Sequence, residues 1–86
     1  MPILSAFFGI MIRMYHSDHN PPHFHIQYGD RKVIMDIKTG GVVHGVLPPR
    51  LHRLVNEWRR LHIPELLNAW NTVQLQKPPK RIKPLE

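Results

Sequence analysis

Histidines gather in one short stretch of this chain. Residues 16–30 have the sequence HSDHNPPHFHIQYGD and hold four of the seven histidines, namely His16, His19, His23 and His25. An imidazole has an ordinary pKa of about 6.5, so it can accept and donate protons near neutrality, and it also binds transition metals. The stretch therefore predicts either acid–base chemistry or a metal site.

Acid–base chemistry on RNA is the first hypothesis. His23 and His25 lie two residues apart, so on a strand both rings lie on the same face. Asp36, which an expected hairpin places opposite His23, could orient that ring and stabilise its protonated form. Such catalysis requires no cofactor, because the 2′-hydroxyl of RNA supplies the nucleophile. The residues expected to hold phosphate are the basic candidates Arg13, Lys32, Arg50 and Arg53.

A metal site is the second hypothesis. Imidazole suits zinc, nickel, copper or iron, and a catalytic zinc site has three protein ligands and one open position. His19, His23 and His25 form an H-x3-H-x-H pattern that could supply three ligands, with Asp18 or Asp36 beside them. This hypothesis predicts a divalent transition metal as cofactor.

A binding module without catalysis is the third hypothesis. Residues 50–86 carry eight Lys and Arg against three acidic residues, which is a net charge of +5 out of +6 for the whole chain. Such a basic half favours RNA or an acidic partner protein, although a solvated basic surface also serves solubility. In this hypothesis the histidines are structural.

Composition excludes several other classes of site. The chain has no cysteine, which rules out disulfides, thiolate zinc sites and cysteine nucleophiles. Gly40-Gly41 indicates only a turn, and no glycine-rich phosphate loop is present. The apolar opening lacks a basic leader and is interrupted by Arg13. We therefore expect no signal peptide, no membrane association and a cytoplasmic location.

A β-hairpin over residues 23–37 is expected to position the histidines. Gly29-Asp30 suits a two-residue turn between two strands. Because side chains alternate between faces, one face of the hairpin is apolar and carries Phe24, Ile26, Val33 and Met35. The other face carries His23, His25, Gln27, Lys32 and Asp36.

The rest of the chain predicts a small α+β fold. Further strands are expected over residues 10–15 and 42–46, followed by two helices that start near Pro48 or Pro49 and at Pro64. Trp58 and Trp70 lie on apolar helical stripes and are expected in the core. The expected architecture is an antiparallel sheet of three to four strands packed against two C-terminal helices.

The domain organisation follows from the same pattern. Residues 1–75 are expected to form a single domain, and residues 76–86 a basic, proline-rich arm that is extended rather than packed. The oligomeric state does not follow from the sequence.

The sequence also carries a resemblance to a known family. It rests on PPHFH at residues 21–25 with Asp18-His19 before it, and on further matches that include Met1-Pro2, Phe8-Gly9-Ile10, Leu47-Pro48, Trp58, Glu65-Leu66 and Trp70. In these residues the chain resembles the bacterial "domain of unknown function 4160" family. The resemblance implies a small protein without an established activity, often encoded beside another short protein in an arrangement like a toxin–antitoxin pair.

Together these observations give one leading expectation and one alternative. The leading expectation is a component of a toxin–antitoxin-like pair that acts on or binds RNA through the histidine-rich sheet face, with a small cognate antitoxin-like protein as partner. The alternative is a metal-binding or partner-binding module without catalysis.

Overall fold

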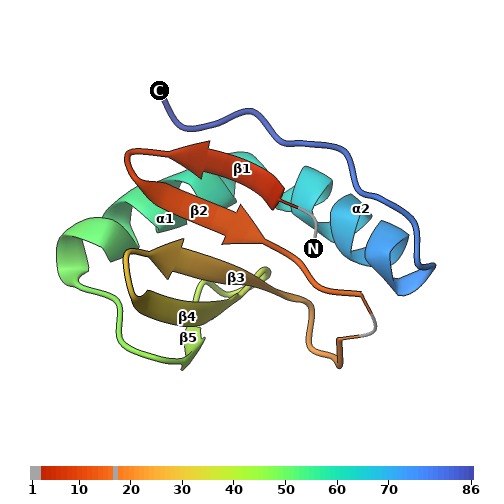
Figure 1. The fold of residues 1–86 in the computed structure, drawn as a ribbon, viewed down its shortest axis with the longest axis horizontal. Helices are drawn as coiled ribbons and strands as arrows, with labels where there is room; N and C mark the ends of the chain where they lie inside the picture. Colours follow the sequence, from red (N-terminus) through yellow and green to blue (C-terminus); the bar gives the residue numbers. More distant parts are fainter. Residues whose placement is uncertain (1–2, 17) are drawn as a thin grey trace.

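Five antiparallel strands and two helices make up the fold in the computed structural model, which describes residues 3–16 and 18–86. Met1, Pro2 and Ser17 therefore lie outside the described residues. The predicted α+β class is confirmed, but the expected three to four strands are too few, because a strand precedes residue 10. In sheet order, the strands are β1 (Ile3–Phe7), β2 (Ile10–Arg13), β3 (His23–Tyr28), β4 (Arg31–Asp36) and β5 (Val42–His44) (Figure 1).

The strand that sequence patterning misses, β1, forms a hairpin with β2. Phe8 and Gly9 connect the two strands with φ values of 49° and 79°, and positive φ at both central residues is the pattern of a type I′ turn. Such turns favour asparagine or glycine at the first position rather than an aromatic residue. A register shift between Ile3 and Ser5 also breaks the alternation of β1, so that Leu4 and Ser5 are both buried. Neither the turn nor the strand therefore carries the usual sequence signal.

The hairpin of β3 and β4 has the predicted register. His23 is opposite Asp36, and the pairing continues to Tyr28 opposite Arg31. β2 lies along the other side of β3, where Arg13 is opposite His25. The predicted division of faces is confirmed by burial of the apolar set Phe24, Ile26, Val33 and Met35.

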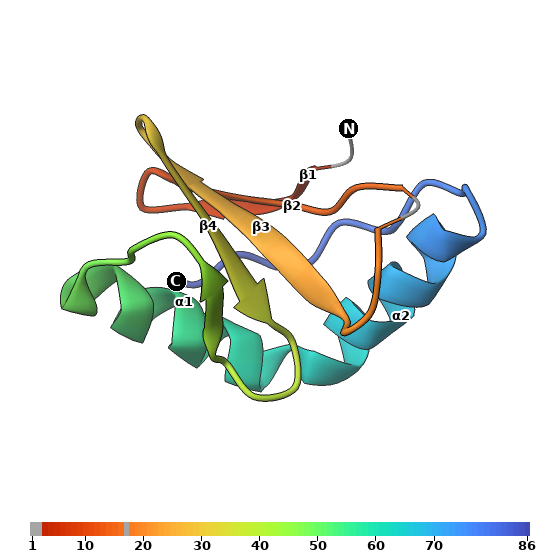
Figure 2. The same ribbon diagram turned by 90° about the horizontal axis from the view of Figure 1, so that it is seen from below.

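Two helices cover the apolar face of the sheet, as Figure 2 shows. They are α1 (Pro49–Leu61) and α2 (Ile63–Gln74), and each has a proline in its first turn, where a missing N–H is tolerated. The predicted core positions are confirmed, because Trp58 is fully buried and Trp70 nearly so. The ring of Trp58 packs edge-on against Phe24, with centroids 5.9 Å apart. Neither helix in the described part of the chain is long and apolar enough to cross a membrane.

Arg59 departs from the helical pattern of α1. The apolar stripe places it away from the core, yet only 6% of the residue is exposed. Its guanidinium donates hydrogen bonds to the backbone oxygens of Ile37 and Lys38 and to Oδ1 of Asn56. Burial lowers the pKa of Arg59, although an arginine remains protonated at neutral pH. Arg59 thus ties α1 to the turn that follows β4.

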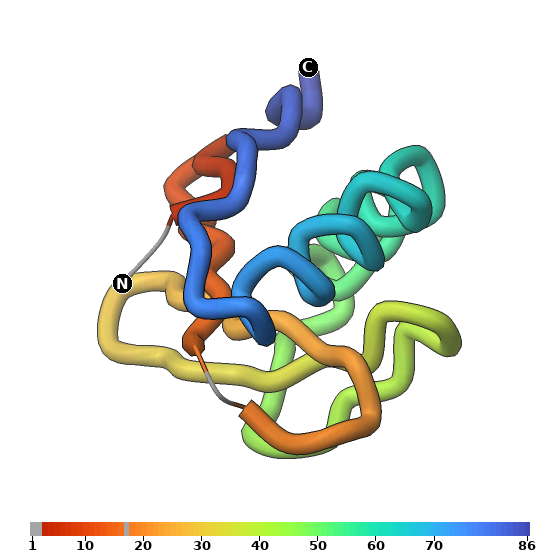
Figure 3. Tube along the Cα trace, turned by 90° about the vertical axis from the view of Figure 1, so that its right-hand side faces the viewer, coloured from red at the N-terminus to blue at the C-terminus, as the bar shows by residue number. Residues whose placement is uncertain are grey.

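Residues 76–86 run alongside β1 and cover the outer edge of the sheet (Figures 1 and 3). The N–H of Ile82 donates to the backbone oxygen of Leu4 at 2.8 Å, and the indole N–H of Trp58 donates to the backbone oxygen of Lys83 at 2.9 Å. The segment is extended, but the expectation that it stays unpacked is wrong. It packs because Ile82 is buried in the core, where its apolar side chain leaves water.

Candidate functional site

The loop between β2 and β3 carries Asp18 to the polar face of the sheet. This loop is held against α2, because Nδ1 of His16 donates to the backbone oxygen of Val73 at 3.3 Å. In addition, Nε2 of Gln74 donates to the backbone oxygen of Asp18 at 3.1 Å. The position of Asp18 therefore depends on a helix that is distant in the sequence.

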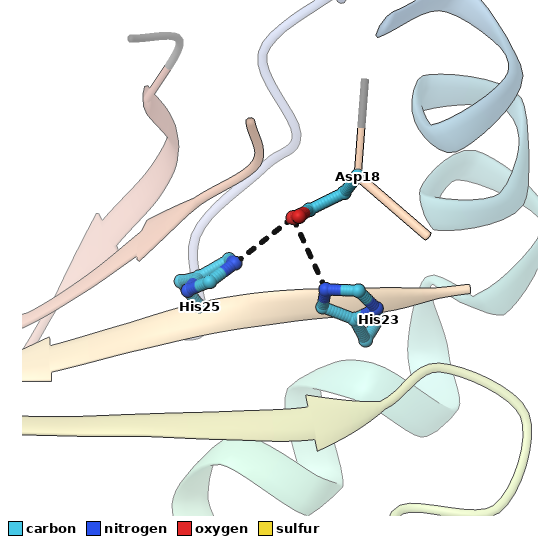
Figure 4. A group of neighbouring side chains, drawn as sticks. All are labelled: Asp18, His23 and His25. Atoms are coloured by element: carbon cyan, nitrogen blue, oxygen red, sulfur yellow. Dashed lines mark hydrogen bonds and ion pairs between the residues drawn. The ribbon is translucent and has the colours of Figure 1, made fainter. Parts of the chain in front are cut away.

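Asp18, His23 and His25 form one group of side chains, here called the Asp18–His23–His25 cluster. Oδ2 of Asp18 lies 3.1 Å from Nε2 of His23 and 3.1 Å from Nε2 of His25 (Figure 4). One potential ligand atom from each residue lies within 4.8 Å of the other two. The side chains are partly exposed, at 12% for His23 and 26% for the other two. The cluster therefore opens to solvent, into a pocket of about 280 Å³ that Ile34 and Val43 also line.

The second ring nitrogen of His23 is fixed by the backbone. Nδ1 of His23 lies 2.7 Å from the backbone oxygen of Pro21. A carbonyl oxygen can only accept, so this nitrogen carries a proton. In a neutral ring Nε2 then bears a lone pair, which is directed at the Asp18 carboxylate. The 3.1 Å contact is favourable when a proton or a metal ion lies between the two atoms.

His25 is held from the side of β2. The ring of Tyr15 stands edge-on to the ring of His25, with centroids 4.3 Å apart. Arg13 is the direct cross-strand partner of His25, so its side chain starts from the same face. The strand pairing thus places Arg13 opposite His25, and the Arg13 guanidinium contacts the sulfur of Met11.

The structure assigns the acidic position of the cluster to Asp18. Asp36 is opposite His23 in the strand register as predicted, but its Oδ1 accepts the backbone N–H groups of Lys38 and Thr39 at 2.8 and 3.0 Å. Sequence reasoning treats Asp18 only as an accessory ligand. The available signal was its place in the Asp-His pair just before the two prolines. His19 lines the pocket of the cluster but is not one of the three residues whose ligand atoms converge.

The predicted phosphate-binding residues fall on two different surfaces. Arg13 and Lys32 lie on the polar face of the sheet with the histidines, where Lys32 is opposite Gln27. Arg50 and Arg53 are exposed on α1, which covers the other face. The structure therefore brings only Arg13 and Lys32 to the histidine face.

Comparison with known proteins gives one match. The family model "Domain of unknown function (DUF4160)" matches residues 9–71, which is 63 of the 86 residues. No curated protein and no solved structure matches the chain. The matched range includes all three residues of the Asp18–His23–His25 cluster.

Proposed function

The chain belongs to the DUF4160 family, and we propose that its Asp18–His23–His25 cluster binds one divalent transition metal ion. The observation that carries this proposal is the convergence of two imidazole nitrogens on one carboxylate oxygen. Two imidazoles and one carboxylate are a donor set that zinc and iron accept. Three protein ligands leave an open coordination position, which a water molecule or a substrate oxygen can fill.

The distances within the cluster support the proposal. Ligand atoms that share a tetrahedral zinc ion at about 2.1 Å lie about 3.4 Å from one another. The two contacts between Asp18 and the histidines are both 3.1 Å, and all three atoms lie within 4.8 Å. A metal ion could therefore enter with small movements of the side chains.

The surroundings of His23 also support a metal ligand. Histidine ligands usually donate the other ring N–H to a carbonyl or carboxylate, which fixes the tautomer and the ring orientation. The contact between Nδ1 of His23 and the Pro21 oxygen has this form. Pro21 lies in the same loop as Asp18, so one segment supplies both the carboxylate and the carbonyl.

A metal titration tests the proposal. We expect the protein to bind one equivalent of Zn²⁺ or Co²⁺, measured by calorimetry and by the visible absorption of bound Co²⁺. The double variant His23→Ala/His25→Ala should lose this binding, whereas His44→Ala, a variant of an exposed histidine on β5, should retain it. Equal binding by the double variant would contradict the proposal.

A second candidate function is metal-free action on RNA as part of a toxin–antitoxin-like pair. It is supported by the same contact, since a proton on His23 also satisfies Asp18 and would give one proton donor beside a second histidine. The net charge of +6 and the presence of Arg13 and Lys32 on that face suit a phosphate backbone. In this proposal the protein works in the cytoplasm and is restrained by a small cognate protein.

The two candidates differ in their response to a chelator. RNA cleavage that persists in excess EDTA and disappears in His23→Ala/His25→Ala would support the metal-free function. Cleavage that stops in EDTA and returns with Zn²⁺ would support the metal centre. Host growth after induction of the protein alone, beside the double variant, shows whether either activity is toxic.

A further inference from the structure

Arg13 is the cross-strand neighbour of His25, and among the described residues it lacks the partners that a half-buried arginine normally has. It is the last residue of β2 and is opposite His25 on β3. Burial alternates along β2, with Ile10 and Ile12 buried and Arg13 partly exposed on the polar face. The guanidinium therefore extends from the face that carries the cluster.

The hydrogen bonds of Arg13 are incomplete. Its Nη2 donates to the sulfur of Met11 at 2.9 Å, and a thioether is a weak acceptor. Its Nε is buried and has no hydrogen-bond partner among the described residues. No carboxylate in residues 3–16 and 18–86 forms an ion pair with it. Buried polar groups are normally satisfied, so Arg13 retains donors that an oxyanion could accept from.

Arg59 provides a comparison within the same molecule. It is more deeply buried than Arg13, and its guanidinium nitrogens donate to the backbone oxygens of Ile37 and Lys38 and to Asn56. The fold thus provides hydrogen-bond acceptors for Arg59, which joins α1 to the turn after β4. Among the described residues, the guanidinium of Arg13 joins no two elements, and the position of Arg13 on β2 is opposite His25 of the cluster.

We propose that Arg13 forms a phosphate-binding subsite beside the metal centre, so that the ligands of this site are phosphate groups or phosphate esters. The inference rests on the proposed metal function, because a phosphate oxygen would take the open coordination position while the guanidinium donates to other oxygens of the same group. Arginine offers a planar fork of donors that matches an oxyanion. Phosphate suits the site better than a carboxylate, because it carries more charge and more acceptor oxygens, and Lys32 adds a second cation on this face.

Titration with inorganic phosphate tests the subsite. The protein is loaded with one equivalent of Zn²⁺, freed of excess metal and titrated by calorimetry. Arg13→Gln should weaken phosphate binding at least tenfold while Zn²⁺ affinity changes less than about twofold. Lys32→Gln, which removes the same charge from the same face, should weaken it less than about threefold. Arg13→Lys keeps the charge without the fork, and we expect an intermediate loss.

Several results would overturn the subsite. Equal losses in Arg13→Gln and Lys32→Gln would mean that only diffuse charge attracts phosphate. Acetate that binds as tightly as phosphate would overturn the assignment to phosphate. Circular dichroism establishes that each variant is folded, and Arg13→Lys serves as the test variant if Arg13→Gln does not fold.

Failure of the metal centre gives a different result from failure of the subsite. If the wild type takes up no Zn²⁺, the metal proposal fails, and the phosphate titration is run on the metal-free protein. Equal phosphate binding by the wild type and Arg13→Gln in that form would overturn the subsite as well. If Zn²⁺ binds but phosphate does not, only the subsite fails.

Discussion

His23 and His25 are held in different ways, although both face Asp18. Nδ1 of His23 donates to the Pro21 oxygen, and the centroid of its ring lies 5.1 Å from the ring centroid of Trp70 on α2. His25 packs against the edge of Tyr15. The orientation of His23 is therefore fixed by a hydrogen bond and that of His25 by packing, so His23 is the more preorganised of the two proposed ligands.

Replacing the Asp18 carboxylate should weaken metal binding. Asp18→Asn keeps the shape of the side chain but removes the negative charge that strengthens binding of a divalent cation, so we expect at least a tenfold loss of Zn²⁺ affinity. The matched control is Asp30→Asn, which removes the same charge from an exposed turn. Competition with a coloured chelator gives both affinities. An unchanged affinity in Asp18→Asn would show that Asp18 is not a ligand.

Sequence reasoning predicts the histidine pair, but for the acidic member it names Asp18 or Asp36 as metal ligands and favours Asp36 as the partner of His23. His23 and His25 share a face because strands alternate, and that periodicity is local. Asp36 is in the predicted cross-strand position, yet its carboxylate caps a turn. Asp18 reaches the cluster through a loop that Gln74 on α2 holds in place. A contact between residues so distant in the sequence has no local pattern that could predict it.

At the scale of elements, the turn between β1 and β2 offers a test of backbone strain. Phe8 has a φ of 49°, a backbone conformation that asparagine adopts more easily than phenylalanine. The Phe8 residue is 57% exposed, so packing of its side chain does little to offset this strain. We expect Phe8→Asn to raise the free energy of unfolding by about 0.5 kcal/mol. Phe8→Ala loses the same ring but keeps the strain, and it should be the less stable variant. Urea denaturation measures both, and greater stability of the alanine variant would contradict this account.

The connection after β5 depends on a glycine that approaches β4 closely. Gly45 has a φ of 89°, and a Cβ there would lie 2.6 Å from the backbone oxygen of Lys32. Gly45→Ala should therefore cost at least about 2 kcal/mol in the free energy of unfolding, from strain together with overpacking. Gly29 is the matched control, because its φ is 58° and a Cβ would meet no atom within 4 Å. Gly29→Ala should cost about 1 kcal/mol. Equal costs in thermal or urea unfolding would contradict the close approach.

Most elements follow from local sequence patterns, and the exception has a physical reason. The central hairpin and both helices have long, regular periodicity and turn or proline signals at their ends, and all three were predictable. β1 has a bulge and an aromatic residue in its turn, so neither signal is present. Its strand conformation is established by pairing with β2 and by burial of Leu4 and Phe7.

At the scale of the whole molecule, a bound metal ion should stabilise the folded state. A ligand present at 100 times its dissociation constant adds about 2.7 kcal/mol to the free energy of unfolding. For a domain of this size, that gain raises the midpoint of thermal unfolding by on the order of 10 °C. We expect such a rise with Zn²⁺ in the wild type and none in His23→Ala/His25→Ala, measured by calorimetric melting. An equal rise in both proteins would show that the metal binds elsewhere.

The segment of residues 76–86 should contribute to global stability rather than act as a free arm. Ile82 is 5% exposed and belongs to the main core cluster, so Ile82→Ala should lower the free energy of unfolding by about 2–4 kcal/mol. Lys83→Ala is the neighbouring control, because Lys83 contacts Trp58 through its backbone oxygen only. Removal of its exposed side chain should change the free energy of unfolding by less than about 0.5 kcal/mol. Urea denaturation of both variants measures the difference, and a small effect of Ile82→Ala would contradict the packing.

The hydrogen bond between Ile82 and Leu4 also has a consequence for biosynthesis. β1 leaves the ribosome before the other strands, but the residue that covers its outer edge is made 78 residues later (82 − 4). Until then the edge of β1 is open to pairing with other nascent chains, as exposed edge strands are. Translation that stalls within the helices would leave this edge open for longer. The yield of native protein should therefore depend on how quickly the ribosome moves from the helices to Ile82.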